Sequence, residues 1–158
     1  MFDDTVAIVR NQDCVDPSVS ISEIFNHDFW GYNLTDQTSH KSYRPLTILT
    51  FRMEIKKFGL NAYNMKITNF FLHCVASCVL LIVLNRLFNN INRNVIFLAA
   101  ILFAVHPVHT EAVAGIVGRA ELLSTLCYLI GIWIFLSIIQ GNILIAVKIV
   151  FLVLNVYI

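Results

Sequence analysis

The chain has 158 residues, of which 58% are hydrophobic and 13% charged, with a formal net charge of +1 and a mean hydropathy of +0.73. Soluble domains carry about 25% charged residues, so this composition excludes an ordinary soluble globular protein. The sequence has no block of lysines or arginines, which argues against a nucleic-acid partner. Residues 1–66 are mixed and polar, whereas residues 67–158 are almost continuously apolar. This division predicts a polar first segment followed by a membrane region.

A short amphipathic helix is expected to begin at Ser20 or Ser22, where Glu23 suits a capping box. Its apolar face would carry Ile21, Ile24, Phe25 and Phe29. The aromatic stretch from residue 25 to 32 favours a helix lying at a membrane interface. The core of a soluble domain would use the same residues, and that alternative stays open.

Asn33-Leu34-Thr35 is an N-glycosylation sequon in a polar loop, which indicates a luminal or extracellular side. Residues 39–46 follow and are rich in donors, among them His40, Lys41 and Arg44. Cations and an imidazole beside a membrane suit a phosphate or an anionic headgroup. The alternative is a solvated loop whose cations pair with Asp28 or Asp36.

A helix is expected from Leu46 to Phe58, because apolar and polar residues alternate there at helical spacing. Gly59 is expected to end it. Four charged side chains of this helix are predicted to point outward: Arg52, Glu54, Lys56 and Lys57.

Four membrane spans are predicted at about residues 67–84, 94–106, 121–139 and 143–158, with a loop at 107–120. A hydrocarbon core of about 30 Å requires roughly 20 residues, so the second span needs the His106–His109 stretch to reach the far interface. His73 in the first span is expected to face the bundle interior, and Lys148 in the last to snorkel or pair. Arg86 and Arg93 place the loop between the first two spans in the cytosol, which agrees with a luminal sequon.

Residues 106–121 form a polar island between two apolar runs, on the same predicted side as the acidic pair Asp3-Asp4. The ionisable side chains of this island are His106, His109, Glu111, Arg119 and Glu121. A carboxylate beside a membrane can act as a general base for a hydroxyl acceptor, while cations and imidazoles hold a phosphate leaving group.

Metal chemistry is weakly supported by these spacings. If Pro107 opens a helix, His109 and Glu111 do not share a face, which disfavours a zinc site. Asp3-Asp4 could bind a divalent cation together with phosphate oxygens, although adjacent carboxylates equally suit a helix start or a solvated turn. Cys74 and Cys78 lie in an apolar run and are expected to be packing residues.

Five blocks of the chain resemble the family of transmembrane and tetratricopeptide-repeat-containing proteins. Their order and spacing over roughly residues 2–139 carry the resemblance, and one block alone would not. The blocks are Phe2-Asp3-Asp4 with residues 7–11, Asp28-Phe29-Trp30-Gly31, residues 39–47, residues 103–114, and Val117-Gly118-Arg119-Ala120-Glu121 with the two leucines that follow.

The resemblance implies an all-α polytopic membrane protein, part of a GT-C-type helix bundle whose luminal loop carries short interfacial helices. It implies an O-mannosyltransferase of the endoplasmic reticulum that moves mannose from dolichyl-phosphate mannose to Ser or Thr hydroxyls, with cadherin domains as acceptors. The expected catalytic side chains are Asp3, Asp4 and Glu111, with Asp3 or Asp4 acting on the acceptor hydroxyl. The expected substrate- and phosphate-binding side chains are His40, Arg44, His106, His109 and Arg119, of which the two arginines are an inference from their charge.

The family's first membrane helix precedes the acidic motif, and this chain begins at that motif. The chain is therefore expected to be a fragment without activity of its own, and residues after 141 match nothing in the family. Two alternatives remain open. One is a non-catalytic scaffold of the endoplasmic reticulum membrane with a vestigial acidic pair. The other is a fragment of an ion or solute transporter, for which His73 and Lys148 would be the clues.

Overall fold

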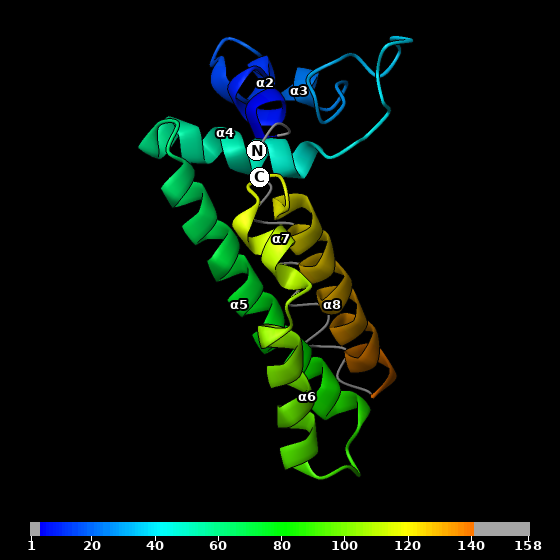
Figure 1. Cartoon of the computed structure of the whole chain (residues 1–158). Helices are drawn as coiled ribbons and strands as arrows, with labels where there is room; N and C mark the ends of the chain where they lie inside the picture. Colours follow the sequence, from blue (N-terminus) through cyan, green and yellow to red (C-terminus); the bar gives the residue numbers. More distant parts are fainter. Residues whose placement is uncertain (1–3, 141–158) are drawn as a thin grey trace. The chain divides into compact units, whose positions relative to one another are not determined.

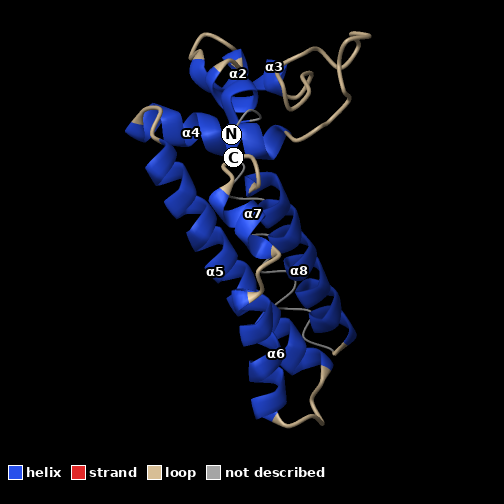
Figure 2. Ribbon diagram, in the orientation of Figure 1, coloured by secondary structure: helices blue, strands red, loops and turns tan. Residues whose placement is uncertain are grey.

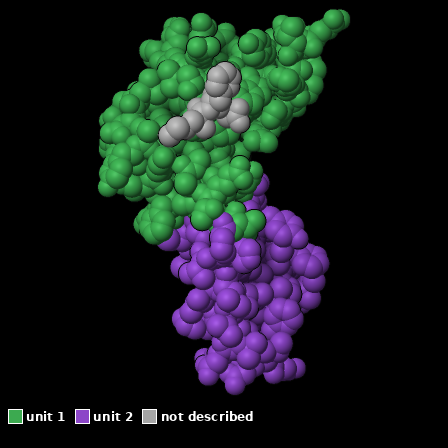
Figure 3. All heavy atoms as spheres, in the orientation of Figure 1, with its two compact units in different colours: residues 1–71, 108–123 green, residues 72–107, 124–158 purple. Residues whose placement is uncertain are grey.

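The computed structural model describes residues 4–140 (Figures 1 and 2). Within this range the chain is all-helical and contains no strand, apart from one isolated bridge between His27 and Asn33. The expected all-α class is confirmed. The chain divides into two compact units, coloured in Figure 3. Unit 1 comprises residues 1–71 and 108–123, and unit 2 comprises residues 72–107 and 124–158.

Unit 1 contains a π-helical turn η1 (Thr5–Val9) and the short helices α2 (Gln12–Val15), α3 (Ile21–Ile24) and α7 (His109–Ala114). It also contains α4 (Pro45–Phe58) and the first turns of α5 (Ala62–Leu87) and α8 (Arg119–Ile139). Helix α2 packs on α4. Burial of apolar side chains from these elements stabilises the unit. The core consists of Ala7, Ile8, Cys14, Ile24, Phe29, Ile48, Phe51, Met65 and Ile116.

The amphipathic helix predicted after Ser20 is much shorter than expected. The capping box of Ser20 and Glu23 is present, but α3 ends at Ile24. The helix does not continue, because the N–H groups of Asp28 and Phe29 donate to the Tyr32 and Ser42 carbonyl oxygens, at 2.7 Å each, instead of to the preceding turn. The Asp28 carboxylate also accepts the backbone N–H groups of Trp30 and Tyr32 at 2.9 and 3.0 Å. The prediction of an interfacial helix through Phe29 is therefore wrong. Phe29 is in the core of unit 1 and Ile21 is 62% exposed.

Helix α4 agrees with its prediction at both ends. Pro45 occupies its first turn, where a missing N–H costs nothing. Gly59 ends it with a φ of 71°, a conformation that favours glycine. The orientation predicted for Glu54 is wrong: this side chain points inward and is 8% exposed. The reason lies outside α4, because a buried guanidinium from α8 meets it there.

Unit 2 contains the remainder of α5, the helix α6 (Arg93–Val105) and the remainder of α8. His73 faces inward as expected, since its Nε2 lies 2.9 Å from the Ala104 carbonyl oxygen and its ring stacks on Phe103. Arg86 lies over the Trp133 ring, with 5.6 Å between the guanidinium carbon and the ring centroid, and donates to the Ser137 hydroxyl. These contacts join α5 to α6 and to α8.

Helices α5 and α8 are long and apolar enough to cross a membrane. Helix α6 has 13 residues, and about 1.5 Å per residue gives it roughly 20 Å, less than a hydrocarbon core. The expected continuation of this helix through residues 106–109 does not occur. His106 is extended, with a ψ of 129°, because the residue before a proline avoids the helical region. The predicted span at 143–158 and Lys148 lie outside the described residues.

Candidate functional site

Asp4 stands at the start of η1 and reaches a segment distant in the sequence. Its Oδ1 accepts the backbone N–H of Val117 at 3.1 Å. Val117 belongs to the short link between α7 and α8, the segment in which the polar island was recognised. The structure thus joins Asp4 to this island within unit 1.

Two cavities in unit 1 meet at this contact. The smaller, of about 280 Å³, is lined by Asp4, Arg44, Glu111, Glu121 and backbone of the α7–α8 link. The larger, of about 530 Å³, has Asp4, Glu111 and Lys66 as its charged side chains. Its other walls are mainly apolar, from η1, the start of α5 and the end of α7. Asp4 and Glu111 line both cavities and stand where the two meet.

The charges of these cavities suit a phosphorylated ligand beside a carboxylate. Arg44 is exposed and lies 5.2 Å from the centroid of the Phe29 ring, which fixes the position of its guanidinium on a core residue. Lys66 is exposed on α5 one turn from its start. A guanidinium and an ammonium can hold phosphate oxygens, while Asp4 and Glu111 can take a proton from a hydroxyl.

The other predicted site residues lie elsewhere. His40 is exposed in the loop before α4, and neither His40, His106 nor His109 lines the two cavities. His109 begins α7, and His106 belongs to unit 2. Asp3 lies outside the described residues.

The glycosylation sequon is accessible. Asn33 and Thr35 are exposed, and the Asn33 Oδ1 accepts the Thr35 N–H and hydroxyl at 3.0 and 2.8 Å. Lys41 binds backbone groups in this loop. Its Nζ donates to the backbone carbonyl oxygens of Leu34 and Asp36.

Arg119 is in a different environment from that expected of a phosphate ligand. Its side chain is fully buried, and its Nη2 lies 2.6 Å from the Glu54 Oε2. The same nitrogen donates to the Met65 carbonyl oxygen at 3.1 Å, and Nε donates to the Asn69 Oδ1 at 2.9 Å. The guanidinium carbon lies 4.4 Å from the Phe51 ring centroid. Its donors thus bind protein groups from α4 and α5.

Sequence reasoning missed three residues of this region: Glu54, Asn69 and Lys66. A buried Glu54 could not be deduced from the spacing within α4, since charged residues surround it there. Asn69 offered a signal, because a polar residue in an apolar membrane helix is costly unless it binds a group inside the protein.

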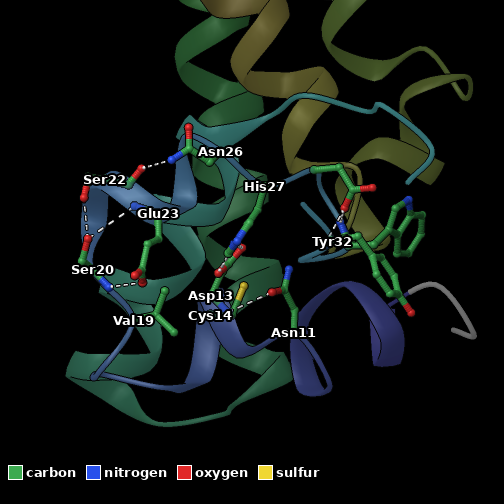
Figure 4. A network of polar contacts seen from close by, with 12 residues as sticks. Asn11, Asp13, Cys14, Val19, Ser20, Ser22, Glu23, Asn26, His27 and Tyr32 are labelled. Carbon is green, nitrogen blue, oxygen red and sulfur yellow. Dashed lines mark hydrogen bonds and ion pairs between the residues drawn. The ribbon is translucent and has the colours of Figure 1, made fainter. Parts of the chain in front are cut away.

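Buried polar contacts hold the N-terminal part of unit 1 together (Figure 4). His27 Nδ1 lies 2.9 and 3.0 Å from the two carboxylate oxygens of the buried Asp13. Asn11 donates to the Phe29 carbonyl oxygen at 3.1 Å. Burial, with a smaller contribution from the Asp13 carboxylate, raises the pKa of Cys14 to about 12, so this thiol stays protonated.

The loop between α3 and α4 is tied by Asp28. The Ser39 hydroxyl donates to its Oδ2 at 2.6 Å, in addition to the two backbone N–H groups described above. Burial alone would raise the pKa of Asp28, but these hydrogen bonds outweigh it and the pKa is lowered. The carboxylate is therefore ionised in the folded loop that leads to Arg44.

Among the described residues, no three His, Cys, Asp or Glu side chains are placed to ligate one metal ion. Asp3, which the sequence suggested as a ligand, is outside that range. The described carboxylates Asp4 and Glu111 line the cavities with Arg44 and Lys66, a mixture of charges that suits phosphate and hydroxyl groups.

The chain is similar to known proteins over 82% of its length. Protein O-mannosyl-transferase TMTC1 of Mus musculus is 50% identical over 131 residues, which are 14% of that protein. TMTC3 of Homo sapiens is 46% identical over 129 residues, 14% of its length, and human TMTC4 is 42% identical over 142 residues, 19% of its length. The chain thus matches less than a fifth of each of these relatives. No protein-family model and no solved structure matches it.

Proposed function

Because this chain belongs to the family of the TMTC protein O-mannosyl-transferases, we propose that it forms part of a membrane enzyme that transfers mannose to proteins. The donor is dolichyl-phosphate mannose, and the acceptors are Ser or Thr hydroxyls, cadherin-type domains among them. The enzyme is a multi-pass protein of the endoplasmic reticulum, and the face that carries Asp4 is luminal. The sequon at Asn33 and the arginines at Arg86 and Arg93 support this topology.

One observation supports the chemistry most directly: Asp4 and Glu111, which are far apart in the sequence, line the same two cavities. Asp4, with Asp3 beside it in the sequence, accepts the proton of the acceptor hydroxyl. The hydroxyl oxygen forms a bond to the anomeric carbon of mannose, and the bond from that carbon to the phosphate oxygen breaks. Its electron pair remains on the lipid phosphate.

The leaving phosphate requires cationic partners, because negative charge develops on it in the transition state. Arg44 at the smaller cavity and Lys66 at the larger supply them. The guanidinium of Arg119 contacts Glu54 and Asn69. Arg119 therefore stabilises the protein structure beside the site and does not contact substrate. The imidazoles at His40, His106 and His109 line neither cavity and are assigned no contact with substrate.

The test uses a full-length protein that carries this segment, expressed in cells without the endogenous activity. Asp4→Asn is expected to abolish mannose transfer to an acceptor domain, measured by mass spectrometry, while membrane insertion stays intact. Asp36→Ala removes an exposed carboxylate from the loop after the sequon and is the control. Undiminished transfer by a protein with both Asp3 and Asp4 replaced would overturn the catalytic assignment and favour the scaffold alternative.

A further inference from the structure

Asn69 lies in α5 and is fully buried, at a place where its side-chain amide meets two backbone carbonyl groups. Its Nδ2 donates to the carbonyl oxygens of Gly115 and Ile116 at 2.9 and 3.3 Å. These two hydrogen bonds constrain the position of the Gly115 and Ile116 backbone, because breaking either one leaves a buried polar group with no partner in the protein or in water. Asn69 therefore fixes the backbone of the α7–α8 link against α5.

The orientation of this amide is determined by Arg119. The Arg119 Nε can only donate, and it lies 2.9 Å from the Asn69 Oδ1. The amide nitrogen must then face the two carbonyl groups. Arg119 itself is held by the Glu54 carboxylate and by the Met65 carbonyl oxygen, at 2.6 and 3.1 Å. Three helices thus contribute to the position of one amide.

The residue after Ile116 is Val117, whose N–H donates to the Asp4 Oδ1 at 3.1 Å. The link is closely packed on its other side, since the Cα of Gly118 approaches α7 so closely that a Cβ there would lie 2.4 Å from the Ala112 carbonyl oxygen. Asn69 holds one flank of this link and Ala112 the other. The direction of the Val117 N–H follows from these two contacts.

We propose that Asn69, oriented by Arg119 and Glu54, is a positioning residue for Asp4. It contacts no cavity-lining carboxylate directly, and it acts by fixing the backbone N–H that holds the Asp4 side chain. The catalytic part of this inference rests on the proposed mannosyltransferase function. The geometric part does not, and it is tested without any substrate.

The first experiment measures hydrogen exchange in peptides covering residues 111–123 of the full-length protein in detergent. Asn69→Asp keeps the acceptor for Arg119 but loses both donors to the carbonyl groups, so exchange in the link is expected to rise about tenfold to a hundredfold. Asn69→Ser removes the amide without adding charge and serves if the first variant does not fold. Asn85→Asp is the matched control on the same helix, because the Asn85 amide bonds only locally, to the Leu81 carbonyl oxygen.

The second experiment measures steady-state mannose transfer. Asn69→Asp is expected to lower kcat about tenfold or more with a change in donor KM below about twofold, since the site is misaligned but its cations remain. In an Asp4→Glu background the same substitution is expected to have little further effect. Two residues that act through one contact are not additive.

The outcomes distinguish the positioning role of Asn69 from the proposed mannosyltransferase function. Raised exchange without any mannose transfer by the wild-type protein supports the geometry and refutes the proposed function. Unchanged exchange in both Asn69 variants overturns the positioning role, as does a link in the wild-type protein that exchanges like an unprotected peptide. Fully multiplicative losses of kcat in the Asp4→Glu background would show that Asn69 acts independently of Asp4.

Discussion

The ion pair between Arg119 and Glu54 gives a large and measurable prediction. Glu54→Gln preserves the shape of the side chain but removes the counter-ion of a guanidinium that is fully buried. Removing one partner of a buried pair costs about 3–5 kcal/mol, because the remaining charge is neither paired nor hydrated. That loss is a large part of a typical folding free energy of about 5–15 kcal/mol.

Cys14 provides the assay, because it belongs to the same core as Phe51 and Met65, which contact Arg119. Its thiol is 2% exposed and reacts with an alkylating reagent only when unit 1 opens. The labelling rate then reports the free energy of opening. A loss of 3–5 kcal/mol corresponds to a rate increase of about 150-fold to several thousandfold.

Glu121→Gln is the control, since it makes the same substitution at an exposed carboxylate in the first turn of α8. Its expected cost is below about 1 kcal/mol, as for other charges at a helix start. The reasoning is refuted if labelling of Cys14 in Glu54→Gln is no faster than in this control. A double variant, Glu54→Gln with Arg119→Met, is expected to recover part of the loss, because it leaves no uncompensated charge.

Three further predictions concern the rest of unit 1. Gly118→Ala places a methyl group against the Ala112 backbone and is expected to destabilise the unit by about 1–3 kcal/mol in the Cys14 assay; Gly131→Ala, with open space around the added Cβ, should show no such loss. Asn33→Gln is expected to remove one endoglycosidase-sensitive glycan, whereas a cytosolic Asn33 would contradict the luminal topology. The lowered pKa of Asp28 means that its stabilising contribution is complete above its unfolded pKa of about 3.9 and is lost as the pH falls through the lower folded value. The protection of residues 28–42 from hydrogen exchange, relative to the intrinsic exchange rate at each pH, should fall in acid, and Asp28→Asn should remove that pH dependence.

Several elements could be read directly from the sequence because local chemistry determines them. Ser20 and Glu23 form a capping box through contacts three residues apart, and Gly59 ends α4 because it can adopt a positive φ. Helices α5 and α8 follow from long apolar runs. The early end of α3 could not be read from periodicity, since it depends on the N–H groups of Asp28 and Phe29 donating to the carbonyl oxygens of Tyr32 and Ser42.

At the candidate site, one part of the arrangement could be predicted from the sequence and another part could not. Residue type and order alone placed Asp4 and the polar island on one predicted side, and the structure brings Asp4 and Glu111 to two cavities, of which the smaller is also lined by Arg44. The sequence could not distinguish an arginine that faces a ligand from one that faces the protein. Both types of arginine carry the same charge, and the difference depends on which distant side chains surround them.

The sequence by itself determined the all-α class, two membrane-length helices and the family, because hydropathy, capping and motif order are properties of neighbouring residues. The tertiary structure alone decided the roles of Glu54, Asn69 and Arg119. These three residues come from separate helices, and Arg119 joins them by its ion pair with Glu54 and its hydrogen bond to Asn69. A buried ion pair forms where the fold excludes water, and no local pattern in the chain specifies where that is.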